Sequence, residues 1–274
     1  MIYDGVILLE ALGDNVCYTG VPTAYFNATG TKLAVRSVGL DTRSSQMAAV
    51  WHNNPHVSWG GDATNWLKYP LVFSKEESYI WNSVYKPMWL YQKLTKKSIS
   101  PDLVRPKLFY PIKQVKKRLI VNDEAGQPIR RGYPYMDALI KSLHASGWDV
   151  VVIRNGVKRL QEKTDALSGY EIYGPYDRAQ CADVKTTIEF MATAHAYIGY
   201  ESGLAHIAGA LNIPYAMFST VAGAEINRHP SCVFAACPCA TPCMNMSCQK
   251  ACMQKLPNYN DVIVTKLQEV LTNG

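Results

Sequence analysis

Short apolar runs alternate with helical patterns through the second half of the chain. The runs have four or five residues each and are rich in residues that favour buried strands, at 118–121, 149–153, 196–199 and 214–218. Between and after them, apolar residues at helical spacing predict helices at 135–146, 187–194, 202–211 and 261–271. Strands that alternate with helices indicate a parallel sheet covered on both faces, an α/β fold.

The first half shows the same alternation less clearly. Apolar runs predict strands at 5–10, 32–37 and 69–73. A helix is expected to follow the first strand, with Asp14 or Asn15 as its N-cap. Residues 76–97 have helical character with a break or bend at Pro87, whereas 52–55 and 59–62 are typical of loops.

Three prolines between 101 and 111 interrupt the chain, and we place a linker at 105–116. The 274 residues then divide into two α/β domains, 1–112 and 113–274, with a cleft between them. Ligands of such sheets bind beyond the carboxyl ends of the strands, so we expect the chemistry to lie at that cleft.

Charge is unevenly distributed. The net charge is +6, but residues 86–131 alone carry twelve Lys or Arg and three acidic residues. This basic block predicts an anionic partner, with a solvated helix face and linker as the alternative. No early segment resembles a signal peptide and no run reaches the ~18 apolar residues of a membrane span, so we expect a cytoplasmic protein, with contact to a membrane surface left open.

Six of the eight cysteines lie between residues 232 and 252. In a reducing compartment a disulfide framework is not expected, which leaves metal binding or packing of reduced thiols. The spacing differs from the paired Cys-x-x-Cys pattern of a zinc ribbon. The candidate ligands of a structural Zn or Fe are Cys237, Cys239, Cys243, Cys248 and Cys252.

The most informative segment is 197–214, in which a strand runs through Glu201-Ser202-Gly203 into a helix of small residues. A helix N-terminus offers unpaired N–H groups and a partial positive charge, and Gly203 allows close approach, so Ser202 and Gly203 predict a diphosphate site. Glu201 is suited to accept hydrogen bonds from sugar hydroxyls. His206 shares the helix side of Ser202 and is a further candidate for donor binding. The alternative is an ordinary strand–turn–helix unit with a buried histidine.

This segment resembles the Asp-Ser/Thr-Gly-Leu-x-His-x-Ala-x-Ala-Leu-x-x-Pro signature of glycosyltransferase family 9, the ADP-heptose:lipopolysaccharide heptosyltransferases. Glu201 stands where that family has Asp. The resemblance implies a short, divergent member with the GT-B fold, two Rossmann-like parallel-sheet domains. It further implies an acceptor-side N-terminal domain and a C-terminal domain that binds a nucleotide-diphosphate sugar as donor. Some members of this family hold metal on cysteine clusters.

Other segments resemble the family in the same order. Residues 7–22 resemble its opening strand and Gly-Asp loop, 131–134 its Lys-x-Trp-Pro element, and 248–253 its cysteine-rich ending. The resemblance implies that Asp14 is the catalytic base, with a simple helix cap as the alternative. It implies that Arg131, assisted by Arg130, neutralises the leaving diphosphate. Weaker candidates for the acceptor side are Tyr18, Thr19, His52 and Trp59.

The function predicted from the sequence is therefore an inverting glycosyltransferase that moves a sugar to an acceptor hydroxyl. An anionic saccharide is the favoured acceptor. Nucleic acid is the alternative, in which the basic block tracks phosphates and a base hydroxyl is glycosylated. A nucleotide-sugar epimerase and a non-catalytic nucleotide-binding module remain as other classes.

Overall fold

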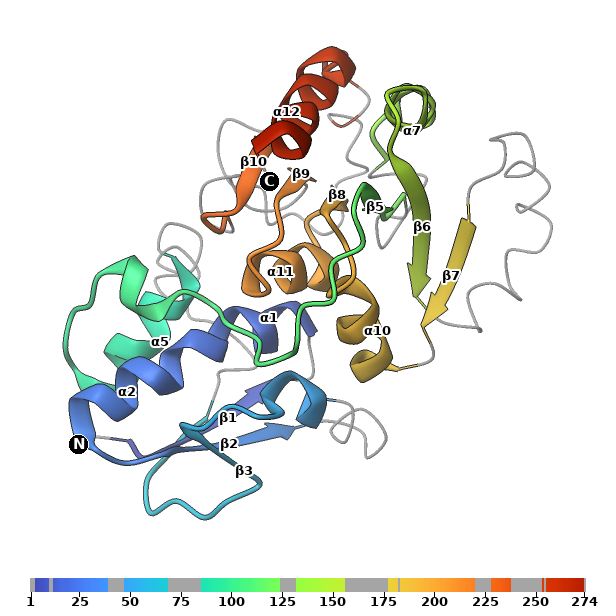
Figure 1. Cartoon of the computed structure of the whole chain (residues 1–274). Helices are drawn as coiled ribbons and strands as arrows, with labels where there is room; N and C mark the ends of the chain where they lie inside the picture. The colour runs from blue at the N-terminus through green and yellow to red at the C-terminus, as the bar shows by residue number, and fades with distance from the viewer. Residues whose placement is uncertain are drawn as a thin grey trace.

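The computed structural model describes residues 3–9, 12–38, 47–68, 85–123, 132–155, 177–181, 183–219, 228–237, 253 and 255–273. These residues form two α/β units, each built on a parallel sheet (Figure 1). The prediction of two parallel-sheet domains of the GT-B type is confirmed.

The N-terminal unit has a four-stranded sheet in the order β3-β2-β1-β4. Its strands are β1 (Gly5–Leu9), β2 (Leu33–Val38), β3 (Val57–Trp59) and β4 (Trp66–Lys68). The helical elements are α1 (Leu12–Cys17), η1 (Tyr18–Gly20), α2 (Val21–Thr29), α5 (Lys86–Thr95) and η2 (Pro101–Val104). Residues 47–51 are also helical.

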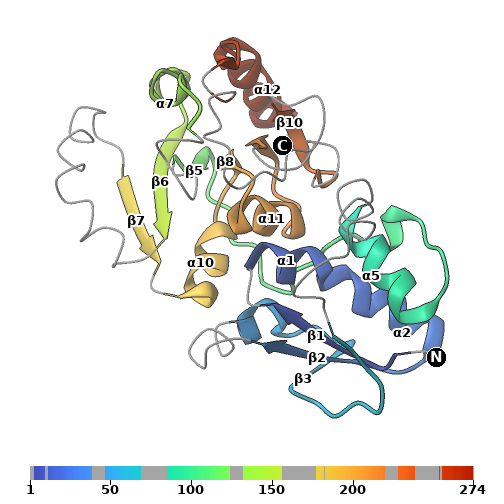
Figure 2. The ribbon, with the colours of Figure 1, turned by 180° about the vertical axis from the view of Figure 1, so that it is seen from behind.

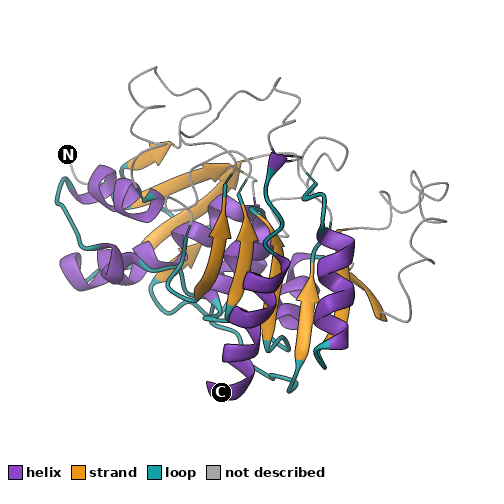
Figure 3. Cartoon of the chain, turned by 90° about the horizontal axis from the view of Figure 1, so that it is seen from above, coloured by secondary structure: helices purple, strands orange, loops and turns teal. Residues whose placement is uncertain are grey.

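The C-terminal unit has a six-stranded sheet in the order β10-β9-β8-β5-β6-β7. Its strands are β5 (Arg118–Val121), β6 (Asp149–Asn155), β7 (Asp177–Cys181), β8 (Ala196–Tyr200), β9 (Tyr215–Phe218) and β10 (Cys232–Ala236). Its helices are α7 (Met136–Ala145), α10 (Val184–Met191), α11 (Gly203–Ala210) and α12 (Asn260–Asn273). Figure 3 shows these strands running in one direction with helices on both sides.

Alternate residues of the central strand enter two different cores. Leu119 and Val121 of β5 pack with the apolar faces of α7 and α12. Ile120, which points the opposite way, belongs to a larger core that includes α10 and α11. That larger core continues into the N-terminal unit through Val16 and Tyr18. The two units therefore share buried apolar packing, and α1 lies directly against α11 (Figures 1 and 2).

Several local predictions differ from the structure. The first helix begins at Leu12, so neither Asp14 nor Asn15 is its N-cap, and the Asn15 side chain instead accepts a hydrogen bond from Trp51 Nε1. Trp59 ends a strand rather than lying in a loop. The strands β7 and β10 were missed. Both lie at an edge of the sheet, and the sequence of β7 is too polar to stand out. The strand expected at 69–73 lies outside the described residues.

The segment 105–117 joins the units as an extended strap. Its backbone is anchored to the C-terminal unit, because Leu108 N donates to Ala210 O, Lys113 N to Ala192 O and Val115 N to Thr193 O. Its other anchor is on the N-terminal unit, where Lys107 N donates to Thr19 Oγ1 at 2.9 Å. None of the helices formed by the described residues is long and apolar enough to cross a membrane.

Candidate functional site

The turn between β8 and α11 carries a buried hydroxyl that does not cap the helix. Ser202 occupies the N-cap position with extended backbone angles, φ −162° and ψ 174°, but its side chain makes no capping bond. Its Oγ is buried beside the equally buried Oη of Tyr197, and neither hydroxyl has any other hydrogen-bond partner among the described residues. Burial raises the pKa of Tyr197, and the neighbouring Ser202 hydroxyl opposes that rise. A ligand at this turn would supply the further hydrogen bonds that the two buried hydroxyls lack within the protein.

Glu201 is oriented by the end of the adjacent strand. Its backbone N–H donates to Phe218 O at 2.9 Å, and Ser219 Oγ donates to its Oε2 at 2.7 Å. The Glu201 side chain is partly exposed, whereas Ser219 is fully buried. The carboxylate is thus held at the carboxyl edge of β8 and β9, where ligands of parallel sheets bind.

Two glycines bring the predicted loops of the two units into contact. A Cβ on Gly13 would lie 3.1 Å from His206 Cδ2 and 3.6 Å from Gly203 N. A Cβ on Gly203 would lie 2.8 Å from the Leu12 side chain. The Gly13-Asp14 backbone therefore approaches the N-terminus of α11 closely. The Asp14 side chain itself lies outside the described residues.

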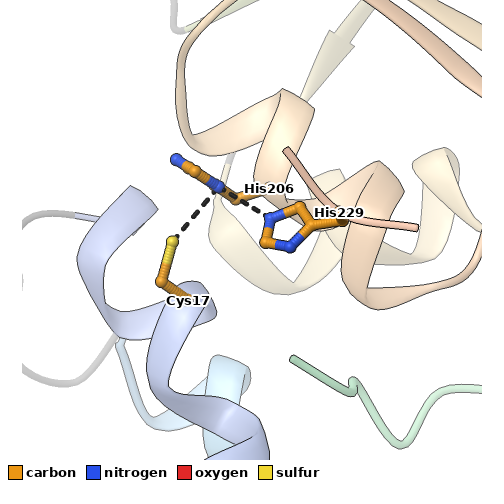
Figure 4. A group of neighbouring side chains, drawn as sticks. All are labelled: Cys17, His206 and His229. Atoms are coloured by element: carbon orange, nitrogen blue, oxygen red, sulfur yellow. Dashed lines mark hydrogen bonds between the residues drawn. The ribbon is translucent and has the colours of Figure 1, made fainter. Parts of the chain in front are cut away.

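His206 points into the interface between the units. Its Nδ1 lies 3.2 Å from Cys17 Sγ, at the end of α1, and 2.9 Å from His229 Nε2, just before β10 (Figure 4). Burial lowers the pKa of His229 to about 4. Burial, then the neighbouring His229 and Lys86, hold the pKa of His206 well below its usual range. Both imidazoles are therefore neutral near pH 7.

The Gly132-Tyr133 segment is tied to the same edge of the sheet. Tyr133 N donates to Tyr200 Oη at 2.7 Å, and the Tyr133 ring stacks on Phe218 with centroids 4.2 Å apart. The Tyr133 hydroxyl donates to Asn260 Oδ1 at 3.1 Å. This element, which resembles the family's Lys-x-Trp-Pro, thus ends beside the residue preceding Glu201. The preceding Arg130 and Arg131 lie outside the described residues.

The four acceptor-side candidates occupy different environments. Tyr18 and Thr19 are fully buried in η1, and Thr19 Oγ1 donates to Val16 O while it accepts from Lys107 N. Trp59 is partly buried and packs on the core. His52 is exposed and lines a cavity of about 360 Å³ between the units, together with Tyr110, Asp183 and Lys185. Of the four candidates, only His52 is exposed at a cavity where an acceptor could reach it.

The cysteine candidates for metal binding fall mostly outside the described residues. Cys237 is described, with a partly exposed thiol that forms no disulfide. The other four, Cys239, Cys243, Cys248 and Cys252, lie outside the described part of the chain, so metal binding by this group stays a prediction.

Comparisons with known proteins place the chain by structure only. No family model and no curated protein matches the sequence. The E. coli ADP-heptose lipopolysaccharide heptosyltransferase II superposes with a TM-score of 0.61 at 11% identity, over 98% of both chains. The iron-containing dodecameric heptosyltransferase TibC, solved with ADP-D-β-D-heptose, gives 0.67 at 13% identity over 100% of this chain and 80% of its own. A family 9 glycosyltransferase from Veillonella parvula gives 0.61 at 9%, over 100% of this chain and 98% of its own.

The chain has the fold of the heptosyltransferases. The resemblance noted in the sequence is thereby confirmed at the level of fold. Three residues near the predicted site were missed by sequence reasoning as functional candidates, namely Cys17, Ser219 and His229. Ser219 follows a predicted strand whose neighbour carries Glu201, so strand adjacency was a usable signal. Nothing in the sequence pairs Cys17 with residues 189 positions away.

Proposed function

We propose that this protein is an inverting glycosyltransferase that binds a nucleotide-diphosphate sugar in its C-terminal unit and transfers the sugar to an acceptor hydroxyl. The observation that carries the proposal is the buried Ser202 hydroxyl at the N-terminus of α11, which caps no backbone N–H and has only the Tyr197 hydroxyl beside it. The helix dipole and free N–H groups favour an anion there. Glu201, oriented by Ser219, is placed to accept from sugar hydroxyls beside it. Shared fold with heptosyltransferases supports the same reaction class.

The roles proposed for the remaining residues follow from this placement. Asp14, next to the glycine that approaches Gly203, takes the proton of the acceptor hydroxyl. Arg131, with Arg130, neutralises the leaving diphosphate. His52 contacts the acceptor, a role supported by its place in the lining of the cavity between the units.

Replacing Ser202 by Ala tests donor binding. A nucleoside diphosphate is expected to raise the melting temperature of the wild-type protein, and Ser202→Ala is expected to weaken its binding by about 10-fold or more, the contribution of a hydrogen bond to a charged group. Thermal-shift titrations with ADP, UDP, GDP and CDP measure this. Ser202→Ala is cleaner than a bulky Gly203 variant, because any Cβ at Gly203 also strikes Leu12.

Ser146→Ala is the matched control, since Ser146 Oγ donates only to Ser142 O at an exposed helix end. It should bind nucleotide like the wild type. The absence of any shift with all four nucleotides would refute the proposed donor site.

The strap favours an anionic acceptor, and we propose a saccharide carried at an anionic membrane surface. Lys107, Lys113, Lys116 and Lys117 are all exposed on it. Ile112 and Val115, 49% and 38% exposed, lie among them. Interleaved apolar and basic side chains suit a surface with both lipid and anionic groups. Arg118, by contrast, already donates to Thr193 Oγ1.

A salt titration separates this acceptor from nucleic acid. Vesicles containing an anionic lipid are expected to bind the protein, and the double charge reversal Lys116→Glu/Lys117→Glu to abolish binding. The same reversal at Lys32 and Lys68, which are exposed on the N-terminal unit, is the control. Binding to a DNA duplex whose log affinity falls with log salt at a slope near −3, about 0.9 for each of three or four phosphate contacts, would instead favour a base hydroxyl as acceptor.

A further inference from the structure

Three potential metal ligands from both units converge at one buried point. Cys17 ends α1 of the N-terminal unit, His206 lies within α11, and His229 precedes β10 (Figure 4). Their Sγ and imidazole nitrogens all lie within 4.8 Å of one another. The three residues are only 2%, 4% and 1% exposed. Among the described residues no other such group of His, Cys, Asp and Glu is found.

The surroundings of His229 select the ring nitrogen that faces this point. Its Nδ1 lies 3.4 Å from Tyr85 Oη, which leaves Nε2 directed at His206 Nδ1. The backbone N–H of His229 donates to Tyr215 Oη at 2.9 Å and fixes the residue in place. An outer hydrogen bond on the second ring nitrogen is the usual arrangement of a metal-bound histidine, because it sets the tautomer.

The spacing of the ligand atoms fits a small divalent ion. Bonds of about 2.3 Å to sulfur and 2.0–2.1 Å to nitrogen in a tetrahedron separate S from N by roughly 3.5 Å and N from N by roughly 3.3 Å. The observed separations are 3.2 Å and 2.9 Å. The third separation, between the ligand atoms of Cys17 and His229, is no more than 4.8 Å. Small side-chain rotations that bring all three separations close to these tetrahedral values make room for the ion.

We propose that Cys17, His206 and His229 bind one divalent first-row transition metal, Zn²⁺ or Fe²⁺, that crosslinks the two units. A thiolate with two imidazoles is the donor set that such ions prefer over Mg²⁺ or Ca²⁺. Binding displaces the thiol proton of Cys17 to solvent, and a water molecule completes a four-coordinate site. This site uses none of the C-terminal cysteines and shares only His206 with the predicted donor-binding residues. Because metal binding is measured without the transfer reaction, its outcome is distinguishable from that of the proposed function.

Metal content of the whole purified protein tests the proposal. Wild-type protein, stripped with a chelator and titrated with Co²⁺ or Zn²⁺, is expected to bind one ion at this site and to melt at a higher temperature with it. Cys17→Ser and His229→Asn are expected to weaken binding at least 100-fold. Tyr85→Phe, which removes only the outer partner, is expected to weaken it about 10-fold. The double variant Cys248→Ser/Cys252→Ser is expected to retain the ion.

X-ray absorption of the zinc-loaded wild type gives an answer even where a variant fails to fold. One sulfur and two or more nitrogen or oxygen neighbours support the site. A zinc shell of three or four sulfurs, loss of all metal in the C-terminal double variant alone, or no stoichiometric binding by the wild type would each overturn the proposal.

Discussion

Asp14→Asn is expected to lower turnover by about 10²-fold or more while nucleotide binding stays close to that of the wild type. Asn is nearly isosteric with Asp and can still form hydrogen bonds, but it cannot accept the proton of an acceptor hydroxyl at neutral pH. The backbone supports this role because Gly13 approaches Gly203 and His206 at the N-terminus of α11. Mass spectrometry of product formed from the nucleotide sugar, with thermal shift for binding, measures the two effects separately.

Asp62→Asn is the matched control, since Asp62 is exposed and ion-paired with Arg36 Nη2 at 3.1 Å. It should leave turnover unchanged, because exposed pairs contribute little to stability. Turnover of Asp14→Asn within threefold of the wild type would contradict the role of base. The helix α1 begins at Leu12, before Asp14. Helix capping, which was the alternative role predicted from the sequence, therefore does not explain the presence of Asp14.

Elements with strong local signals were predictable from the sequence. The strand β8 and helix α11 are found within a residue of their predicted ends, because a fully buried apolar strand, a glycine turn and a helix of small residues leave little ambiguity. The edge strands β7 and β10 were missed, and only β7 has a sequence polar enough to account for it. Asn15 was misread as a cap because its actual partner, Trp51, is distant in the chain.

The residues of the candidate site also fall into a group that the local sequence predicts and a group that it does not. The Ser202-Gly203 turn was predicted as a ligand site from chemistry within a few residues, and the structure adds that the Ser202 hydroxyl is buried beside Tyr197 and does not cap the helix. The Cys17–His206–His229 group escaped prediction because its members are separated by 189 and 23 positions and meet only when the two units pack together. Sequence reasoning predicted metal ligands in the cysteine-rich segment, most of which lies outside the described residues, so metal binding there stays a prediction. A cluster of cysteines close together in the sequence can be recognised from the sequence alone. Ligands that meet across the interface between two units cannot.

The strap that joins the units depends on a second close contact, at Gly20. A Cβ on Gly20 would lie 2.0 Å from Arg105 O and 2.6 Å from Val104 O. Both obstacles are backbone atoms, so no side-chain rotation relieves the clash. The neighbouring bond from Lys107 N to Thr19 Oγ1 holds the strap against η1 at the same place. An added methyl group must therefore displace the strap or the start of α2.

Gly20→Ala is accordingly expected to destabilise the protein by about 3 kcal/mol or more, at or above the upper end of the usual range for overpacking. Gly30→Ala is the informative control. Gly30 has a positive φ of 74° but nothing within 4 Å of its Cβ position, so the cost is conformational only, about 1 kcal/mol. Urea denaturation of the two variants measures both values. Equal destabilisation of the two variants would show that the strap moves away from Gly20 at little cost in free energy. The contact of the strap with the N-terminal unit would then not fix how the two units are joined.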